Sequence, residues 1–411
     1  MIKILFSFKG NARACVYTEP LWAIPYFLYV PFFTLYKNSL GLSDVQIGTV
    51  LSIGLVFQVI SAFAGGALTD KFGRRYTLFI FDIISWTIPC LLWAFAKDIR
   101  WFIAAAIINS MQQISATAWH CTLVEDTKSE QIVPIFNWIN ICGQLVVFFV
   151  PISGFLVSRY DLIPVMRGLF IFSTILMTFK FIFMFILSTE TNQGKKRLAE
   201  TKDESVSKLL AGLKNIFLKA INNPATVTAV LISTVSMICV MIAGNFFSLY
   251  VTQNLNVPQI YIAWFPIIRA VVMLTFFFLL QRYFSRMPLK RVMIISLGLF
   301  TIAHILLIIS PWLPINMLSP VIIFTIFDAS ATALFMPRRE AILAFNVEPG
   351  ERARIMSIVY ALSLAAMSPF GWIAGLISSI DRRLPFMFNL LLFGVLALLV
   401  VRDKGHKEVI A

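Results

Sequence analysis

Five charged side chains lie within long apolar stretches of the sequence, namely Glu19, Asp82, Lys180, Arg269 and Asp328. A charge at the centre of a membrane helix costs about 2.5–3.5 kcal/mol on insertion scales, so each is a candidate functional residue. Asp328 is the leading candidate, because a buried carboxylate can take up and release a proton during transport. Arg269 has two interpretations: it binds an anionic group of a substrate, or it forms a buried ion pair with Asp328.

The remaining three charges also have two interpretations each. Lys180 either belongs to a binding site or extends its long side chain to the membrane surface. Glu19 and Asp82 lie a short distance into their apolar stretches. Each of these acids is therefore either a proton site or the partner of a nearby arginine, Arg13 or Arg75.

Histidines and aromatic residues add a second set of candidates. His120 and His304 lie in apolar stretches, and no cysteine or carboxylate cluster accompanies them, so we expect no metal ion and no cofactor. Each histidine is either a proton relay or a core residue with satisfied hydrogen bonds. Six aromatic residues either line a cavity for a sugar or an amphipathic drug, or simply pack in the core: Trp22, Tyr26, Trp86, Trp119, Trp138 and Trp264.

Membrane-spanning helices are the elements that must position these residues. Of 411 residues, 59% are hydrophobic and 13% are charged, which excludes soluble, disordered and disulfide-stapled classes. A helix needs about 20 apolar residues to cross a bilayer. Twelve such spans are predicted, at 14–37, 44–68, 75–96, 101–124, 132–158, 163–188, 225–252, 258–281, 291–310, 315–337, 353–379 and 384–401.

The basic residues orient these spans. In the loops on the side of the N-terminus lie 25 of the 34 Lys and Arg residues, against seven in the loops of the opposite side. Because Lys and Arg in short loops stay in the cytoplasm, both termini are predicted to be cytoplasmic. The same bias accounts for the net charge of +14, so we expect no nucleic-acid partner.

A polar interval at 190–223 separates two groups of six spans. We therefore predict an N-terminal bundle over 1–189, a cytoplasmic linker over 190–223 that is amphipathic around 206–217, and a C-terminal bundle over 224–411. A short repeat supports a duplication, since Phe32-Phe33-Thr34-Leu35-Tyr36 ends the first span and Phe246-Phe247-Ser248-Leu249-Tyr250 ends the seventh. Two parallel repeats predict a substrate site at their interface near the bilayer midplane.

The most specific motif follows the second span and reads Gly66-Ala67-Leu68-Thr69-Asp70-Lys71-Phe72-Gly73-Arg74-Arg75. Gly66 would let two helices approach closely, and Gly73 would permit a tight turn. Asp70 offers a carboxylate to cations or to a helix N-terminus. Arg74 and Arg75 would hold this loop on the cytoplasmic side.

This motif resembles the loop motif of the major facilitator superfamily, and the layout of six plus six spans extends the resemblance over nearly the whole chain. The resemblance implies an all-α membrane fold with twelve transmembrane helices in two pseudo-symmetric six-helix bundles. It also implies a conformational latch, in which Asp70 stabilises the outward-facing state through the start of span eleven, near 353–357. We expect Lys71, Glu125 and Asp126 to join this latch with the two arginines.

Together these features predict a monomeric secondary active transporter in the plasma membrane, which moves a small molecule by alternating access and is coupled to protons. Drug efflux and transport of a sugar or another organic solute are both open. Span four lacks the arginine that proton-coupled drug antiporters usually carry, and this absence makes drug efflux the weaker of the two hypotheses. The alternative is a lipid or lysolipid flippase on the same fold. An enzyme or a channel is disfavoured, because we find no nucleophile elbow, no HExxH motif and no re-entrant pore loop.

Overall fold

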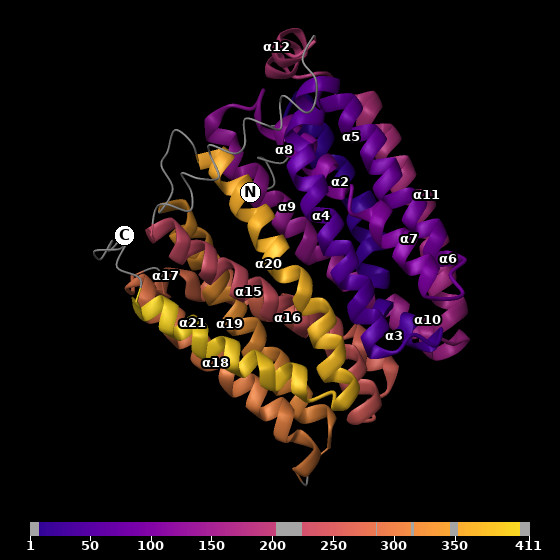
Figure 1. Cartoon of the computed structure of the whole chain (residues 1–411), viewed down its shortest axis with the longest axis vertical. Coiled ribbons are helices and arrows are strands. Elements are labelled where there is room, and N and C mark those ends of the chain that lie inside the picture. The colour runs from indigo at the N-terminus through magenta and orange to yellow at the C-terminus, as the bar shows by residue number, and fades with distance from the viewer. Residues whose placement is uncertain (1–7, 203–223, 285, 314–315, 346–351, 403–411) are drawn as a thin grey trace. The chain divides into compact units, whose positions relative to one another are not determined.

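The computed structural model describes residues 8–202, 224–284, 286–313, 316–345 and 352–402, without the side chains at 129, 133, 224–226, 281–282, 343–345 and 352–359. All regular secondary structure in these residues is helical (Figure 1). Ten of these helices are long and apolar enough to cross a membrane. The chain is therefore an α-helical multi-pass membrane protein, as its composition predicts.

The chain divides into two compact units, and unit 1 comprises the described parts of 1–33, 53–156 and 160–214. In this unit α2 packs against α9 and α11, and α5 packs against α8 (Figure 1). Its helices are α2 (Gly10–Tyr29), η1 (Val30–Phe32), most of α4 (Asp44–Phe72), α5 (Arg74–Asp82), η2 (Ile83–Thr87), α6 (Ile88–Ala94), α7 (Ile99–Asn109), α8 (Gln112–Val124), α9 (Ser129–Val146), η3 (Val147–Phe149), most of α10 (Val150–Tyr160), α11 (Leu162–Leu187) and α12 (Asn192–Glu200).

Unit 2 comprises the described parts of 34–52, 157–159 and 215–411, so that it includes the start of α4. Here α18 packs against α19 and α21, and α15 packs against α20 and α21 (Figure 1). Its helices are α3 (Phe33–Ser39, from its second residue), α15 (Pro224–Leu249), η4 (Tyr250–Asn254), η5 (Gln259–Ala263), α16 (Phe265–Thr275), η6 (Phe276–Leu280), α17 (Gln281–Phe284), α18 (Leu289–Ile309), η7 (Ser310–Trp312), α19 (Leu318–Phe345), α20 (Arg352–Ile380) and α21 (Leu384–Arg402).

Two of the twelve predicted spans are helical but interrupted. The predicted span 14–37 consists of α2, η1 and α3, and α2 contains Pro20 and Pro25, each of which removes a backbone hydrogen bond. The predicted span 101–124 breaks at Ser110 and Met111, between α7 and α8. The other ten correspond to the ten candidate membrane helices in the described residues, with ends shifted by a few positions.

Residues of the sequence repeat are buried in both copies. Phe32, Tyr36, Phe246 and Tyr250 are each at most 1% exposed. Each unit also has its own hydrophobic core, around Cys15 and its neighbours in unit 1 and around α15, α18, α19 and α21 in unit 2. Of the predicted linker, α12 is described, whereas the amphipathic stretch 206–217 lies outside the described residues.

Candidate functional site

Three of the predicted intramembrane charges meet in unit 1. Lys180 on α11 places its Nζ atom 3.9 Å from Oε2 of Glu19 on α2. Asp82, the last residue of α5, interacts electrostatically with Lys180 and with the hydroxyl of Ser115 on α8. Lys180 and Asp82 are only 4% and 6% exposed. We call Glu19, Asp82 and Lys180 the carboxylate–lysine cluster.

These contacts decide between the interpretations of the sequence. Because Lys180 is buried beside Glu19, it does not extend to the membrane surface. Glu19 and Asp82 have this lysine as their cationic neighbour in place of the expected Arg13 or Arg75. Arg13 lies over the ring of Tyr17, and Arg75 donates to the carbonyl oxygen of Phe185 on α11. Each arginine thus contacts a group other than the acid expected as its partner.

An unsatisfied oxygen makes the cluster a candidate site. Within the described residues, Oε2 of Glu19 is buried and has no hydrogen-bond partner. Buried polar atoms without a partner are rare in folded proteins, and each calls for an explanation such as a functional role or a bound species. This oxygen is available to a proton or to a hydrogen-bond donor on a ligand.

Three of the six predicted aromatic residues border the cluster. Trp22 and Tyr26 follow Glu19 on one face of α2 and stack with ring centroids 4.7 Å apart. Trp86 lies in η2, a single π-helical turn directly after Asp82, and meets Trp22 edge-on at 5.0 Å. These rings form an apolar wall beside the charged groups.

The other predicted aromatic residues lie elsewhere. Trp119 contacts His120, and its Nε1 atom has no hydrogen-bond partner in the described residues. Trp138 packs against the core of unit 1. Trp264 in unit 2 is 49% exposed. The structure therefore divides the predicted aromatic group into one cluster and three separate residues.

The two predicted charges of unit 2 form an ion pair. Arg269 on α16 donates through Nη1 to Oδ2 of Asp328 on α19, and through Nη2 to the hydroxyl of Thr332 at 2.8 Å. Asp328 is 8% exposed. The structure thus shows the pairing that was expected as the structural alternative, in which this acid and this base balance each other's charge.

The two histidines have different surroundings. His304 is 1% exposed, its Nδ1 lies 2.9 Å from the Phe300 carbonyl oxygen, and its Nε2 lies 3.3 Å from the amide nitrogen of Asn389. With both ring nitrogens satisfied, His304 matches the interpretation as a core histidine. His120 is exposed on α8 and contacts Trp119 and Phe136.

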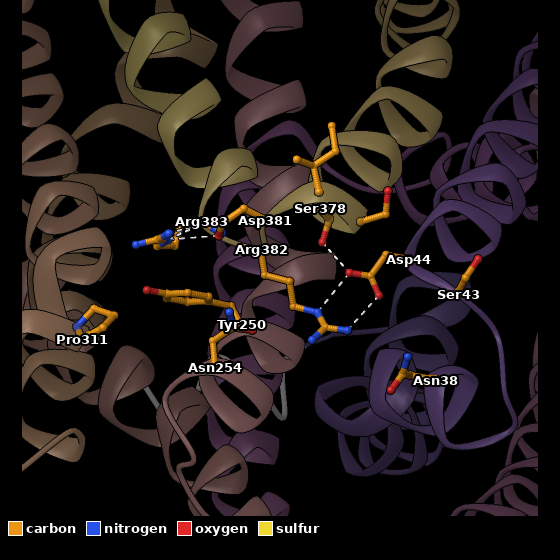
Figure 2. Close-up of a pocket in the computed structure, with 12 residues that line it drawn as sticks. Asn38, Ser43, Asp44, Tyr250, Asn254, Pro311, Ser378, Asp381, Arg382 and Arg383 are labelled. Atoms are coloured by element: carbon orange, nitrogen blue, oxygen red, sulfur yellow. Dashed lines mark hydrogen bonds and ion pairs between the residues drawn. The ribbon is translucent and has the colours of Figure 1, made fainter.

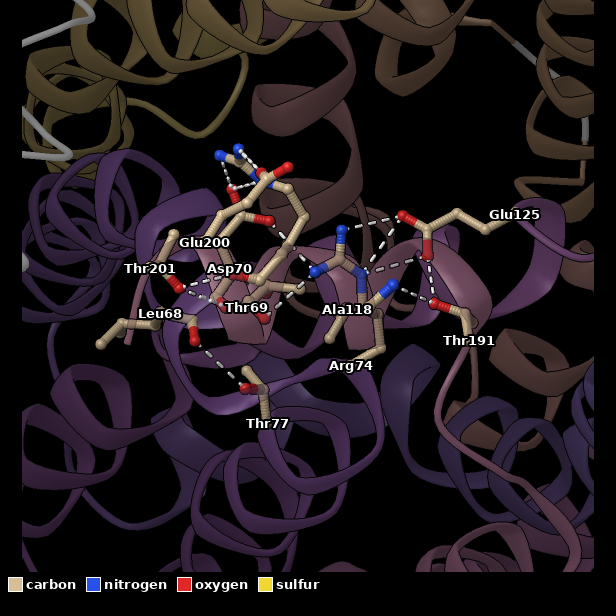
Figure 3. A network of polar contacts seen from close by, with 12 residues as sticks. Leu68, Thr69, Asp70, Arg74, Thr77, Ala118, Glu125, Thr191, Glu200 and Thr201 are labelled. Carbon is tan, nitrogen blue, oxygen red and sulfur yellow. Dashed lines mark hydrogen bonds and ion pairs between the residues drawn. The ribbon is translucent and has the colours of Figure 1, made fainter. Parts of the chain in front are cut away.

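The loop motif forms a network of charged groups around Arg74 (Figure 3). Arg74 is 4% exposed, and its guanidinium lies 3.0 Å from Oδ1 of Asp70 and 2.9 Å from Oε1 of Glu125. Asp70 also pairs with Arg197 of α12 at 2.7 Å. Thr191 donates its hydroxyl to Glu125. Hydrogen bonds to Asp70 and Glu200 raise the pKa of Arg197, so this residue remains charged.

A second carboxylate, Glu190, caps the helix that starts with this motif. It accepts hydrogen bonds from the backbone N–H groups of Arg74 and Arg75, at 3.1 Å each, where a helix N-terminus favours negative charge. Gly73 precedes them with φ 82°, and a Cβ atom there would overlap the Glu190 carboxylate. The tight turn expected at Gly73 is confirmed.

Gly66, Lys71 and Asp126 are the remaining residues of the predicted motif and latch. A Cβ atom at Gly66 would meet nothing within 4 Å, so the expectation of a close approach there is wrong, and Gly65 instead abuts Thr117. Lys71 donates to the carbonyl oxygen of Lys202 at 3.4 Å. Asp126 accepts from the backbone N–H of Asn192 at 3.2 Å. The side chains at 352–359, the expected partners of Asp70 in span eleven, lie outside the described residues.

A polar pocket of about 610 Å³ lies within unit 2 (Figure 2). At its edge Asp44, the first residue of α4, accepts hydrogen bonds from Arg382 at 3.0 and 3.2 Å and from the hydroxyl of Ser378 at 2.6 Å. Asp381 and Arg383 form another pair in the same pocket, and this hydrogen bond lowers the pKa of Asp381. We call Asp44, Ser378 and Arg382 the Asp44 clamp.

Helix packing beside the clamp is unusually close. A Cβ atom at Gly48 would overlap the carbonyl oxygen of Gly371 and lie 3.0 Å from the Cα atom of Gly375. Ser52 accepts a hydrogen bond from the backbone N–H of Trp372 at 2.7 Å. Small residues thus bring the start of α4 against α20, as glycines do in membrane helix contacts.

The sequence analysis missed several of these residues. A capping box at Ser43 and Gln46, whose backbone N–H groups and side chains bond reciprocally, marks the start of α4 beside Asp44. Amide side chains inside the predicted spans are a second signal in the sequence. No local signal identified the further partners found here, which are Glu190, Thr191, Arg197, Ser378 and Arg382.

Comparison with known proteins gives a family and a fold. The model of the Major Facilitator Superfamily matches residues 22–286 and 229–410. No curated protein matches the sequence.

Three solved structures illustrate the similarity of the fold. The nucleoside transporter NupG is 15% identical with a TM-score of 0.72, covering 97% of this chain and 100% of that one. A D-xylose-proton symporter is 15% identical with a TM-score of 0.76, covering 96% and 99%. A peptide transporter POT in complex with sulfate is 12% identical with a TM-score of 0.69, covering 95% and 93%. Since the family model spans most of its length, the chain belongs to the Major Facilitator Superfamily.

Proposed function

We propose that this protein is a secondary active transporter that couples the movement of a small solute to protons by alternating access. Membership of the Major Facilitator Superfamily supports the transport class. The observation that carries proton coupling is the imbalance of charge in the carboxylate–lysine cluster, where the buried Asp82 and Glu19, whose side chain is 16% exposed, share one lysine.

Charge counting shows why this cluster suits a proton. With Glu19, Asp82 and Lys180 all ionised, the cluster carries one net negative charge, and binding of one proton makes it neutral. A buried charge is costly in a membrane, so binding of this proton removes a large unfavourable free energy from the unit. The Arg269–Asp328 pair is already neutral, and we therefore place the coupling site at the cluster, although Asp328 was the leading candidate of the sequence.

The aromatic wall supports a solute site next to the proton site. Trp22 and Trp86 lie directly beside Glu19 and Asp82 along their helices, so a bound solute and a bound proton would occupy neighbouring positions. Polar groups near an apolar wall are typical of sites for small molecules. The bias of basic residues supports cytoplasmic termini, and we propose a monomer in the plasma membrane.

Proton flux into liposomes tests this function. The purified protein is reconstituted with a pH-sensitive dye inside, and sugars, nucleosides, organic anions and cationic amphiphiles are added in turn. We expect at least one solute to change the internal pH. Glu19→Gln and Asp82→Asn should abolish accumulation driven by a pH gradient while solute exchange at equal pH persists.

Asp328→Asn is the comparison variant, because Asp328 belongs to the balanced pair. If accumulation survives in both cluster variants and is lost only in Asp328→Asn, the coupling site lies in unit 2 and our assignment is wrong. Absence of proton movement with every solute would refute proton coupling itself.

A lipid or lysolipid flippase is the second candidate, and an apolar groove of about 760 Å³ on unit 1 favours it. The groove is lined by Ile24 and Leu28 of α2 together with residues of η3, α10 and α11, and its wall is almost wholly apolar, which suits an acyl chain. Movement of a fluorescent lysolipid between leaflets of the same liposomes, without solute-dependent proton flux, would favour this function.

A further inference from the structure

Two irregular stretches of backbone meet beside the carboxylate–lysine cluster. The first is η2 (Ile83–Thr87), a π-helical turn inside a span, and the second is the break at Ser110 and Met111 between α7 and α8. The side-chain amide of Asn109 donates to the carbonyl oxygen of Ser85 at 2.7 Å and so joins the two. Irregular backbone at membrane depth is tolerated only where it is buried in protein or lines a cavity, and π-turns are frequent at functional sites.

The polar side chains at this junction keep unused hydrogen-bonding capacity. Ser85 is 0% exposed, and its hydroxyl has no partner in the described residues. Gln112 donates one amide N–H to Asn109 at 3.2 Å. A glutamine amide offers two N–H donors and one acceptor oxygen. The second N–H of Gln112 and its side-chain oxygen have no hydrogen-bond partner in the part of the chain that the structure describes.

The chemistry of these free groups restricts the ligand. A hydroxyl and an amide provide both donors and acceptors, and neither carries a charge. An anion would accept from the donors and leave the amide oxygen unpaired, whereas a cation would bind the amide oxygen and leave the donors unpaired. Adjacent hydroxyl groups on a ligand can pair with the donors and with the amide oxygen. Trp86, the next residue after Ser85, adds the flat apolar wall that it shares with Trp22.

We propose that Ser85, Asn109 and Gln112 form the hydrogen-bonding subsite for an uncharged solute rich in hydroxyl groups, such as a monosaccharide or the ribose of a nucleoside. This inference rests on the proposed transport function and specifies its substrate class. The subsite lies next to the proton site, since Asp82 is the last residue of α5 and Ser85 lies in η2, the π-helical turn that follows it. The proposed solute site and proton site are thus three residues apart on consecutive helical turns.

A purely structural role for these residues makes a different prediction. If the amides only hold α7, α8 and η2 together, the free hydroxyl of Ser85 contributes nothing, and its removal leaves no group unpaired. Ser85→Ala would then leave transport unchanged and would not lower stability. If the hydroxyl bonds to the solute, the same variant weakens solute binding without weakening the fold.

Exchange of radiolabelled D-xylose and of uridine in proteoliposomes tests the subsite, with KM and kcat measured separately. Loss of one hydrogen bond to the solute corresponds to roughly a fivefold rise in KM, and we expect this rise for Ser85→Ala. For Gln112→Leu, which removes both donors and the acceptor of the amide, we expect a rise in KM of about tenfold. In both variants kcat should be nearly unchanged. Ser173→Ala is the matched control, since Ser173 is equally buried but already bonds to the Leu169 carbonyl oxygen at 2.7 Å. Gln113→Leu controls for loss of an amide, because Gln113 bonds to Gln58 on α4.

The outcomes separate this inference from the proposed function. Transport of D-xylose or uridine with unchanged KM in Ser85→Ala and Gln112→Leu would overturn the subsite. Proton-coupled transport of charged or amphipathic solutes alone would also overturn it while the proposed function stands. If no solute moves protons, thermal shifts of the wild-type protein and Ser85→Ala with D-xylose and uridine still decide it: stabilisation lost in the variant supports the subsite, and no stabilisation of the wild type overturns it.

Discussion

Replacing Arg74 with alanine should lower the melting temperature of the protein by about 6–12 °C. Arg74 is 4% exposed and pairs with Asp70 and Glu125, whose side chains are 24% and 15% exposed. Removing one partner of a buried ion pair costs about 3–5 kcal/mol. In the variant Asp70 still pairs with Arg197, and Glu125 still accepts a hydrogen bond from Thr191, so we expect a loss of unfolding free energy at the low end of this range, about 3 kcal/mol. For a unit of this size, each kcal/mol lowers the melting temperature by about 2–4 °C.

Thermal unfolding of the detergent-purified protein, followed by tryptophan fluorescence, measures this effect. Glu125→Gln removes the charge that Arg74→Ala leaves unpaired, so the double variant should lose less stability than the sum of the single variants. Arg75→Ala is the control, because Arg75 contacts the carbonyl oxygen and ring of Phe185 and pairs with no carboxylate in the described residues. A melting temperature of Arg74→Ala within about 2 °C of the wild type, or simple additivity in the double variant, would refute the reasoning.

Three further outcomes follow from the same contacts. Gly73→Ala should cost about 1–3 kcal/mol, because φ at this position is 82° and the new Cβ atom overlaps Glu190, whereas Gly66→Ala, which meets open space, should unfold near the wild-type temperature. Asp44→Asn should lower the melting temperature by several degrees, because Asp44 is 5% exposed and the variant loses its charged hydrogen bond with Arg382. Asp381 is more exposed, so Asp381→Asn should change the melting temperature by less than about 2 °C. Arg197→Ala should cost less than about 1 kcal/mol in the same assay, since its side chain is 33% exposed and Asp70 retains Arg74; a loss as large as that of Arg74→Ala would contradict this view of the network.

The class of the protein and the motif loop were predictable because their signals are local. A span is a continuous run of apolar residues, so most of the predicted ends agree with the helices. The turn at Gly73 was predictable because only glycine adopts its φ without strain. Even the capping box at Ser43 is readable from residues three positions apart.

Interruptions of helices were harder to foresee. The predicted span 101–124 is apolar throughout most of its length, yet it breaks at Ser110 and Met111. In the preceding span, η2 interrupts the helix and ends two residues before Pro89. A break becomes favourable only when other groups satisfy the freed backbone atoms. At η2 the carbonyl oxygen of Ser85 accepts from Asn109, which is 24 positions away in sequence.

The sequence by itself therefore determined that this is a membrane protein of many spans, the position of its motif loop and the identity of its buried charges, because hydropathy and local turns depend on neighbouring residues. Only the tertiary structure decided which charges meet. Lys180 pairs with Glu19 across 161 positions, and Arg197 pairs with Asp70 across 127. The physical reason is that an ion pair depends on which helix faces touch, and helix packing is set by the whole unit and not by spacing along the chain.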